Sequence, residues 1–491
     1  MNLAATLLAD AGADPGRLVS VGDSGPVGLR DLGDRSRIVS AVLAAHGVRA
    51  GDVVALALPD RPAWIAAFLG IARIGAIAAL VGEGMGADRA RDLITRAGAR
   101  MLITERDDLT CDQTLGMRDL REAGSASDPG VRDMSHGDPL YLLATSGSTG
   151  ASKWAVHVHG DIPSCIATYG RRVLRMGPGD VTWSVAALAT SYGLGNSLYF
   201  PIGAGAAAWL GGERDPAGAA HACQEGGVNA MFGVPTFWAR LARHVAEGRV
   251  PADAFAAVHL AVSAGEHLPE AVWRAVEATT GMRLVNGLGS SEATNLYLSD
   301  RRGSPGPGRV GWPVPGYDVR IAGSERPAVG DEGELLVRGP TVMRGYLDDP
   351  VATGKALENG WLHTGDVVQL EPDGGYRFVG RNGDVFKAGA LWVDPLKVQA
   401  VLLDDPDVYD AVVLGAEDPD GVTRLVAVVA AQPTPDLEGR LMAACHDRLE
   451  HHLVPRLILA TDTLPATPSG KVRRDAIREM ATSALSDRGV A

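Results

Sequence analysis

Cysteine is scarce in this chain of 491 residues, and its four cysteines lie far apart. Cys111, Cys165, Cys223 and Cys445 show neither the close spacing of a metal site nor the dense pattern of a disulfide framework. The absence of such a framework favours a reducing compartment, so we expect a cytoplasmic protein.

Basic clusters and membrane-length apolar runs are also absent. The formal net charge is −13 without a basic block, which argues against nucleic acid as a partner, because phosphate contacts need clustered lysine and arginine. The short apolar stretch at the start has no basic flank, so we expect no signal peptide. The most apolar run, residues 63–82, is interrupted by Arg73 and by glycines. This pattern favours a buried helix followed by a strand, and we expect no membrane span.

What the first part of the chain does contain is an alternation of helical and strand patterns. Helical spacing occurs at residues 31–46, 62–74 and 88–97, and short apolar runs occur at 53–58, 76–81 and 101–103. This alternation predicts parallel sheets covered by helices, which is a fold of the α/β class. The length suggests two or more domains.

Beyond about residue 310 the pattern changes to hairpins. Apolar runs at 367–370 and 376–379 flank Glu371-Pro372-Asp373-Gly374-Gly375, which favours a hairpin turn. Residues 380–384 have the composition of a connector. The remaining length of about 105 residues fits a small α+β domain. Its last long helix is predicted at 437–453.

The most informative stretch follows the strand predicted at residues 140–144. It consists of Thr145, Ser146, Gly147, Ser148, Thr149, Gly150, Ala151, Ser152 and Lys153. The glycines allow close approach of the backbone, and the amides, hydroxyls and lysine can donate to phosphate oxygens. The spacing is not that of a Walker A loop, because no Gly-Lys-Ser/Thr closes it. Taken alone, the stretch fits a phosphate-binding loop or a polar surface loop.

Four further motifs follow in a fixed order. They are Gly289-Ser290-Ser291-Glu292, Thr364-Gly365-Asp366, Gly380-Arg381-Asn382-Gly383-Asp384 with Lys387, and Pro468-Ser469-Gly470-Lys471. Together with the loop they resemble the superfamily of acyl-CoA synthetases, peptide-synthetase adenylation domains and luciferases, over essentially the whole chain. Residues 191–197, 232–236 and 263–266 are similar to the benzoate-CoA ligase branch.

The resemblance implies the adenylate-forming enzyme fold. It implies an N-terminal acyl- and AMP-binding domain at residues 1–380, a hinge at 381–384, and a mobile C-terminal lid domain at 385–491. It also implies two steps, in which a carboxylate first attacks the α-phosphate of ATP to give an acyl-adenylate and the thiol of CoA then displaces AMP. The expected cofactors are ATP or AMP, Mg²⁺ and coenzyme A. Monomer and homodimer both remain open.

The same resemblance assigns roles to individual residues. Glu292 holds Mg²⁺ and Ser291 contacts the α-phosphate, whereas Lys471 bridges the substrate carboxylate and the α-phosphate during adenylation only. Asp366 accepts the ribose hydroxyls, and Arg381 reaches the same ribose or a phosphate. The other expected nucleotide-binding residues are Thr145, Ser146, Gly147, Ser148, Thr149, Gly150, Lys153, Asn286 and Gly287.

The thiol acceptor is expected to meet a loop of the C-terminal domain. Its residues, by resemblance, are Lys387, Gly389, Ala390, Leu391 and Trp392. The family has glycine at the position of Ala390, which is a mild change. The hinge carries Gly383 where a charged residue is more usual, and glycine accepts the large φ/ψ changes of a hinge.

By the same resemblance, a third group of residues is expected to line the acyl pocket. These are Ser191, Tyr192, Gly193, Ala264, Gly265, Gly289 and Asn295. Residues 186–190 are small where the benzoate branch carries bulky aromatics, and Asn295 stands where that branch has histidine. Smaller residues leave volume, so we expect an acid larger than benzoate, such as a polycyclic or terpenoid acid of a biosynthetic pathway.

Trp154 is the main departure from the family, which nearly always has glycine after this lysine. An indole next to the phosphate loop adds a large apolar body. Either Trp154 turns into the core and changes nothing, or it hinders ATP and pyrophosphate and weakens adenylation. In the second case the enzyme takes an acyl-adenylate made by a separate adenylating enzyme.

The sequence therefore predicts an AMP-forming acyl- or aryl-CoA ligase for a bulky carboxylic acid, with adenylation in question and thioester formation retained. Three alternatives remain. They are a complete ligase of the benzoate type, an adenylating enzyme that loads a carrier protein, and a non-catalytic binding protein on the same scaffold.

Overall fold

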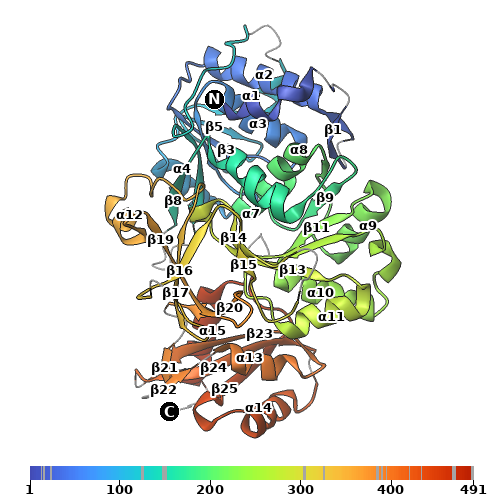
Figure 1. Cartoon of the computed structure of the whole chain (residues 1–491), viewed down its shortest axis with the longest axis vertical. Coiled ribbons are helices and arrows are strands. Elements are labelled where there is room, and N and C mark those ends of the chain that lie inside the picture. The colour runs from blue at the N-terminus through green and yellow to red at the C-terminus, as the bar shows by residue number, and fades with distance from the viewer. Residues whose placement is uncertain are drawn as a thin grey trace.

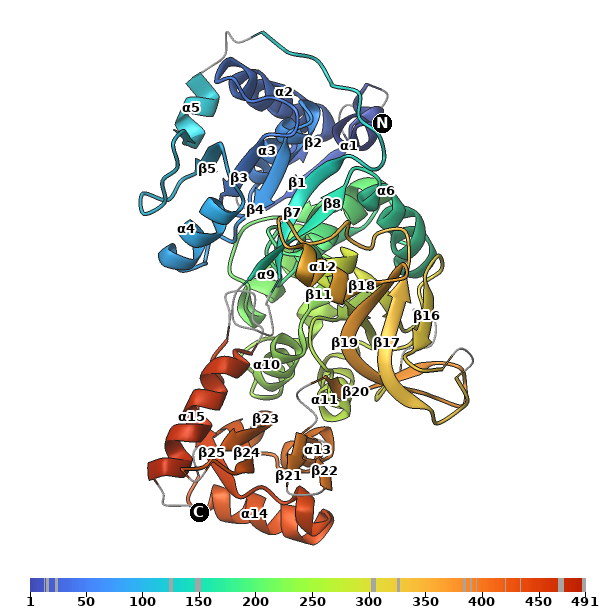
Figure 2. The ribbon, with the colours of Figure 1, turned by 90° about the vertical axis from the view of Figure 1, so that its left-hand side faces the viewer.

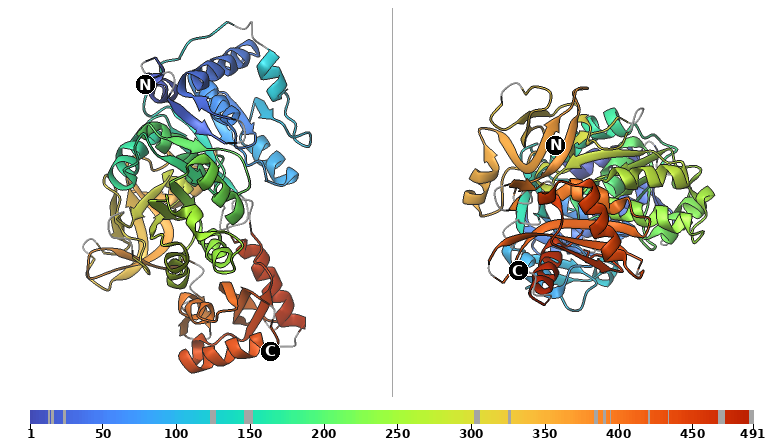
Figure 3. Two further views of the ribbon diagram at one scale, coloured as in Figure 1. Left: turned by 90° about the vertical axis from the view of Figure 1, so that its right-hand side faces the viewer. Right: turned by 90° about the horizontal axis from the view of Figure 1, so that it is seen from below.

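The computed structural model consists of a large N-terminal domain and a small C-terminal domain (Figure 1). It describes the chain except residues 13, 15–16, 23–24, 123–126, 146–151, 302–305, 325–326, 383–385, 389–390, 394, 420, 433, 467–471 and 488–491. The N-terminus and the C-terminal domain lie at opposite ends of the long axis (Figure 3).

The first sheet is built from the alternating elements predicted at the start of the chain. Its strand order is β6 (Thr114–Leu115), β5 (Met101–Thr104), β3 (Val53–Ala57), β4 (Ile77–Leu80), β7 (Pro139–Thr145) and β8 (Lys153–Val158). Neighbouring strands are parallel except β7 and β8. Helices α2 (Leu29–Ala45) and α3 (Pro62–Arg73) pack on one face and α4 (Ala87–Arg96) on the other. The predicted helix-covered parallel sheet is confirmed, including α3 followed by β4 in the apolar run.

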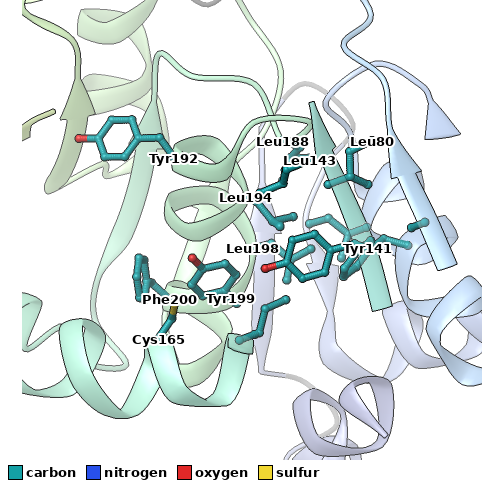
Figure 4. Close-up of a cluster of buried hydrophobic side chains, with 14 of the residues drawn as sticks. Leu80, Tyr141, Leu143, Cys165, Leu188, Tyr192, Leu194, Leu198, Tyr199 and Phe200 are labelled. Carbon is teal, nitrogen blue, oxygen red and sulfur yellow. The ribbon is translucent and has the colours of Figure 1, made fainter. Parts of the chain in front are cut away.

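The second sheet is larger and carries parallel strands in its centre. Its order is β15 (Trp312–Pro313), β14 (Leu296–Ser299), β13 (Leu284–Gly289), β12 (Leu260–Ser263), β11 (Ala230–Gly233), β9 (Val181–Ser184), β10 (Ala207–Trp209), β1 (Leu18–Val21) and β2 (Val27–Gly28). Helices α9 (Pro216–Gly226), α10 (Pro235–Ala246) and α11 (Glu270–Thr280) cover one face. The helical segments 161–174 and 191–204 belong to the core on the other face, where Leu194, Leu198 and Tyr199 lie beside Tyr141 of β7 (Figure 4).

A third, antiparallel sheet follows where hairpin patterns were predicted. It contains β16 (Asp318–Ile321), β17 (Glu332–Arg338), β18 (Leu357–Glu358), β19 (Trp361–Leu370) and β20 (Tyr376–Arg381). The predicted turn joins β19 to β20, with the amide of Glu371 bonded to the carbonyl of Gly375 at 2.8 Å. Gly374 lies in this turn at a φ of +79°, which glycine accepts without strain.

The C-terminal domain is a small α+β unit. Its elements are β21 (Phe386–Ala388), β22 (Leu391–Val393), α13 (Pro395–Leu403), β23 (Val408–Glu417), β24 (Thr423–Ala431), α14 (Leu437–Arg448), β25 (Leu457–Thr461) and α15 (Arg474–Asp487). Strand β24 pairs antiparallel with β23 and parallel with β25. Helices α13 and α14 pack on one face of this sheet, and α15 packs on the other.

One predicted element of this domain is wrong in its extent. The helix predicted at 437–453 ends at Arg448, and Leu449 is extended, with φ −116° and ψ 151°. Residues His451–Leu453 form a separate 3₁₀ turn, because the chain reverses to bury Leu453 in the core that already holds Leu441. Across the described part of the chain, the helices are too short or too polar to cross a bilayer.

The two domains meet beneath α10 and α11 (Figure 2). The guanidinium of Arg243 on α10 lies 4.2 Å from the ring centroid of Tyr409 on β23. The side chain of Glu266, which follows β12, accepts a hydrogen bond from the amide of Val472 at 2.7 Å. Burial, and next the negative charge of Glu266, raise the pKa of Asp410 to about 7. The interface therefore brings two acidic side chains close together.

Replacement of Asp410 by asparagine is expected to stabilise the protein increasingly as the pH rises from about 4 to about 7, with the full effect above 7. Because the pKa of Asp410 is raised from 3.8 to about 7, its favourable contribution is present below 3.8 and is lost as the pH rises through about 7. Asparagine is neutral throughout. The melting temperature of Asp410→Asn should exceed that of the wild type by about 2–4 °C at pH 8.5, and the difference should shrink as the pH falls and vanish near pH 4. An equal difference at both pH values would contradict this expectation.

Candidate active site

The ends of the predicted phosphate loop are fixed by the β7–β8 hairpin. Thr145, the last residue of β7, pairs with Lys153, the first residue of β8. Ser152 is buried, and its hydroxyl and carbonyl accept hydrogen bonds from Arg89 at 2.7 Å and Arg96 at 2.5 Å. The hydroxyl of Thr145 is buried and has no hydrogen-bond partner among the described residues, so it is available to a ligand. The predicted residues Ser146, Gly147, Ser148, Thr149 and Gly150 lie outside the described residues.

The side chain of Tyr346 contacts both Lys153 and Glu292. The ammonium of Lys153 lies 5.1 Å from the ring centroid of Tyr346. The hydroxyl of Tyr346 donates to Oε1 of Glu292 at 2.8 Å. Burial, and then the negative charge of Glu292, raise the pKa of Tyr346, so the hydroxyl stays a donor. No sequence motif marks Tyr346, because a single tyrosine in a loop shows neither periodicity nor metal-ligand spacing.

Ser291 and Glu292 lie in the 3₁₀ turn Ser291–Ala293, and a hydrogen bond connects this turn to β8. Nε2 of His157 donates to the carbonyl oxygen of Ser291 at 2.7 Å. Nδ1 of the same ring lies 2.8 Å from Oδ2 of Asp161 and 2.8 Å from the hydroxyl of Thr294. His157 and Thr294 are fully buried, and this network fixes the turn that presents the two predicted residues. No motif in the sequence marks His157.

Asp366 and Arg381 face each other across β19 and β20, as their predicted shared role requires. Nε of Arg381 donates to Oδ1 of Asp366 at 2.8 Å, and the hydroxyl of Tyr297 donates to Oδ2 at 3.2 Å. Burial raises the pKa of Asp366, and the charge of Arg381 opposes this rise. The negative charge of Glu292 also contributes to raising the pKa of Asp366 and that of Arg381. Glu292 therefore lies within electrostatic range of this pair.

The predicted acyl-pocket residues gather at the carboxyl ends of the central strands. The hydroxyl of Tyr192 lies 3.4 Å from the carbonyl oxygen of Gly233 on β11 and 3.3 Å from that of Val262 on β12. A side chain at Gly193 would lie 2.0 Å from the carbonyl oxygen of Ala187, so glycine is required there. Ligands of parallel sheets bind at such carboxyl ends. This position supports Ser191, Tyr192 and Gly193 as pocket residues.

Asn295, by contrast, is used for internal packing. Its amide nitrogen donates to the hydroxyl of Tyr199 at 3.1 Å, and its amide oxygen accepts from the backbone of Leu296 at 2.8 Å. Asn286 is similar, because its amide nitrogen donates to the carbonyl oxygen of Arg309 at 2.7 Å. Both side chains are 4% exposed, so their predicted ligand contacts stay predictions.

The remaining predicted residues divide into two groups. Gly287, Gly289 and Ala264 lie on or next to β13 and β12, beside the turn of Glu292, and Gly265 follows Ala264 with a φ of +94°. In the C-terminal domain, the hairpin β21–β22 pairs the backbone of Lys387 with that of Trp392 and the backbone of Ala388 with that of Leu391. Gly383, Gly389, Ala390 and Lys471 lie outside the described residues.

Trp154 turns into the core. Strand alternation places its indole on the face of β8 opposite to Lys153, among the side chains packed between the sheet and α4. The side chain is 3% exposed, and its Nε1 donates to the carbonyl oxygen of Leu93 at 3.1 Å. Of the two alternatives drawn from the sequence, the structure supports the one in which the indole turns into the core.

Comparison with known proteins supplies the family. A model of the AMP-binding enzyme family matches residues 9–347, and a model of the AMP-binding enzyme C-terminal domain matches residues 397–471. A 4-hydroxybenzoate–CoA/benzoate–CoA ligase of Rhodopseudomonas palustris is 31% identical, with 95% of this chain and 90% of that protein covered. A benzoate–CoA ligase of Thauera aromatica is 34% identical over 70% of this chain and 66% of its own length.

Solved structures agree with the fold. A benzoate CoA ligase from Burkholderia xenovorans superposes with a TM-score of 0.89 at 27% identity, covering 97% of this chain and 100% of that chain. An anthranilate CoA ligase in complex with anthranoyl-AMP superposes with a TM-score of 0.90 at 25% identity, covering 99% and 98%. The chain spans about two-thirds of the length of some curated relatives, 66% of the Thauera ligase and 64% of a p-hydroxybenzoic acid–AMP ligase of Mycobacterium tuberculosis.

Removal of the indole of Trp154 is expected to affect stability. Trp154→Ala deletes a buried aromatic side chain and should lower the free energy of unfolding by about 3–5 kcal/mol. Trp154→Phe keeps most of the packing and loses only the hydrogen bond to Leu93, so it should cost about 1–3 kcal/mol. Urea denaturation measures both values. A cost below about 1 kcal/mol for Trp154→Ala would contradict the buried position.

Proposed function

The chain belongs to the AMP-binding enzyme family, and on this premise we propose that it is an AMP-forming aryl-CoA ligase. Its reaction converts an aromatic carboxylic acid, ATP and CoA into an aryl-CoA thioester, AMP and pyrophosphate. The names of the relatives support this substrate class, because they are ligases of benzoate, hydroxybenzoate and anthranilate.

The observation that carries the proposal is the arrangement of Lys153, Tyr346 and Glu292. The side chain of Tyr346 contacts the ammonium of Lys153 through its ring and the carboxylate of Glu292 through its hydroxyl, beside a hairpin that closes a loop rich in glycine and hydroxyl groups. A triphosphate needs positive charge along its length and a carboxylate for its accompanying metal ion. Asp366, paired with Arg381 and within electrostatic range of Glu292, adds carboxylate oxygens that can accept from ribose hydroxyls.

Glu292 is the residue that would hold Mg²⁺. Its half-buried carboxylate offers oxygen ligands, which Mg²⁺ prefers, and no arginine or lysine forms an ion pair with it among the described residues. When bound, the ion neutralises phosphate charge. The contribution of the protein is orientation, because the bond from Tyr346 and the network beneath Ser291 fix the direction of the carboxylate.

The proposed reaction has two steps. In the first, an oxygen of the substrate carboxylate bonds to the α-phosphorus of ATP while the bond to pyrophosphate breaks, with Ser291 and Lys471 contacting the transferred group. In the second, the thiol sulfur of CoA bonds to the acyl carbon, the bond to AMP breaks and the thiol proton is released. Rotation of residues 385–491 about a hinge at 381–384 would exchange Lys471 for the loop at residues 387–392 between the steps.

The position of Trp154 favours a ligase that performs both steps. Since the indole lies in the core, nothing in its placement obstructs phosphates next to Lys153. The preference for an acid larger than benzoate rests on Ala187 and Ala189, which are half-buried and precede Tyr192. Asn295 does not contribute to this argument, because its amide is bonded to Tyr199.

The proposed function is tested by assaying the two half-reactions separately over a panel of acids. The panel runs from benzoate, hydroxybenzoates and anthranilate to naphthoates and polycyclic acids. Acid-dependent ATP–pyrophosphate exchange measures adenylation, and CoA-thioester formation measures the second step. We expect both activities, with greater efficiency for the larger acids. Exchange without any thioester would favour an adenylating enzyme for another acceptor, and thioester formation only from a supplied adenylate would favour an impaired first step.

Tyr346→Phe is expected to lower the efficiency of adenylation. The variant keeps the ring beside Lys153 and loses the hydrogen bond to Glu292, so kcat/KM for Mg·ATP should fall by about 3- to 10-fold and the Mg²⁺ requirement should rise. Thioester formation from a synthetic acyl-adenylate should change little. Tyr376→Phe, at a buried tyrosine of β20 in the third sheet, is the control. A wild-type Mg²⁺ dependence in Tyr346→Phe would contradict a role in orienting Glu292.

A further inference from the structure

Glu266 connects the central sheet of the N-terminal domain to the C-terminal domain. It follows β12 directly, after the buried Ala264 and the left-handed Gly265, so its backbone is held by the sheet. Its Oε1 accepts a hydrogen bond from the amide of Val472 at 2.7 Å, although 206 residues separate the two. A carboxylate that accepts from a backbone amide is a charge-assisted bond and is stronger than a neutral one.

Val472 lies at a structurally defined position in the C-terminal domain. It directly follows Lys471 in the sequence and forms an antiparallel bridge with Ala466. The amide of Arg473 donates to the carbonyl oxygen of Pro465 at 2.8 Å. These two contacts connect the chain segment before residues 467–471 to the segment after them. Helix α15 begins at the next residue, Arg474. Glu266 therefore binds Val472, the residue directly after Lys471, at the point where the chain on either side of residues 467–471 is paired.

The negative charge of Glu266 has an electrostatic cost, because it lies near the carboxyl group of Asp410. Asp410 of β23 lies close enough that the charge of Glu266 contributes to the raised pKa of its carboxyl group. Two carboxylates at one interface repel each other, and a neutral side chain at position 266 would avoid this repulsion. An acceptor for the amide of Val472 is the benefit that offsets the cost. The bond to the amide of Val472 is thus a contact across the domain interface that opposes this repulsion.

We propose that Glu266 is a positioning residue for the first half-reaction, because it holds the base of the Lys471 segment against the end of β12. This inference rests on the proposed function, in which Lys471 takes part in adenylation and leaves before thioester formation. A contact present in only one of two domain orientations stabilises that orientation alone. Loss of the bond between Glu266 and Val472 is thus expected to affect one half-reaction and not the other.

The test compares three variants in the two half-reaction assays. Glu266→Ala removes the acceptor and should lower the kcat of ATP–pyrophosphate exchange about 10-fold, with little change in the KM values for ATP and acid. Thioester formation from a synthetic acyl-adenylate should stay the same or rise. Glu266→Gln keeps an acceptor oxygen and should retain exchange within about threefold of the wild type. Glu270→Ala is the matched control, because Glu270 is exposed on α11 and pairs with Arg274 of the same helix.

Two results would overturn the proposal. One is undiminished exchange in Glu266→Ala. The other is an equal loss of both half-reactions, which indicates general damage to the interface. The failure of the proposed function looks different, because the wild type would then show neither exchange nor thioester formation with any acid of the panel.

Discussion

The antiparallel pairing of β8 with β7 is the constraint on which the candidate site depends. It closes the loop between Thr145 and Lys153, and it fixes the direction in which every side chain of β8 points. Lys153 faces Tyr346 on the side of the proposed ligand, and Trp154 faces α4 in the core. A shift of register by one residue would exchange these two faces, so the same pairing that buries the indole also exposes the lysine.

The same strand organises parts of the chain that are distant in sequence. The backbone of Trp154 and Val156 is bonded to the segment 344–347, which brings Tyr346 over the site. The next residue after Val156, His157, donates a hydrogen bond to the carbonyl oxygen of Ser291. Edge strands need a partner for their free backbone groups, and here that need is met by the segment that delivers Tyr346. Packing requirements and the geometry of the candidate site are therefore satisfied by the same contacts.

The interface between the two domains differs in character from this rigid centre. Among the described residues it includes a cation–π contact of Arg243, a carboxylate–amide bond of Glu266 and an acidic neighbour, Asp410. Such polar contacts contribute less than a buried apolar interface and can be exchanged at small cost. A C-terminal domain that is held by a few specific contacts can change orientation, as the proposed two-step reaction requires.

The sequence by itself determined the α/β class, the order of most helices and strands, and the family, because apolar periodicity and short motifs are local properties of the chain. Short motifs also marked Asp366, Arg381, Ser291 and Glu292 as candidate site residues, whose roles stay predictions. The tertiary structure alone decided the direction of Trp154, the hydrogen bond from Tyr346 to Glu292, and the contact of Glu266 with Val472. The first of these depends on which face of the sheet α4 covers. The other two join residues 54 and 206 positions apart, and no local pattern encodes a contact whose partner is chosen by the packing of the whole chain.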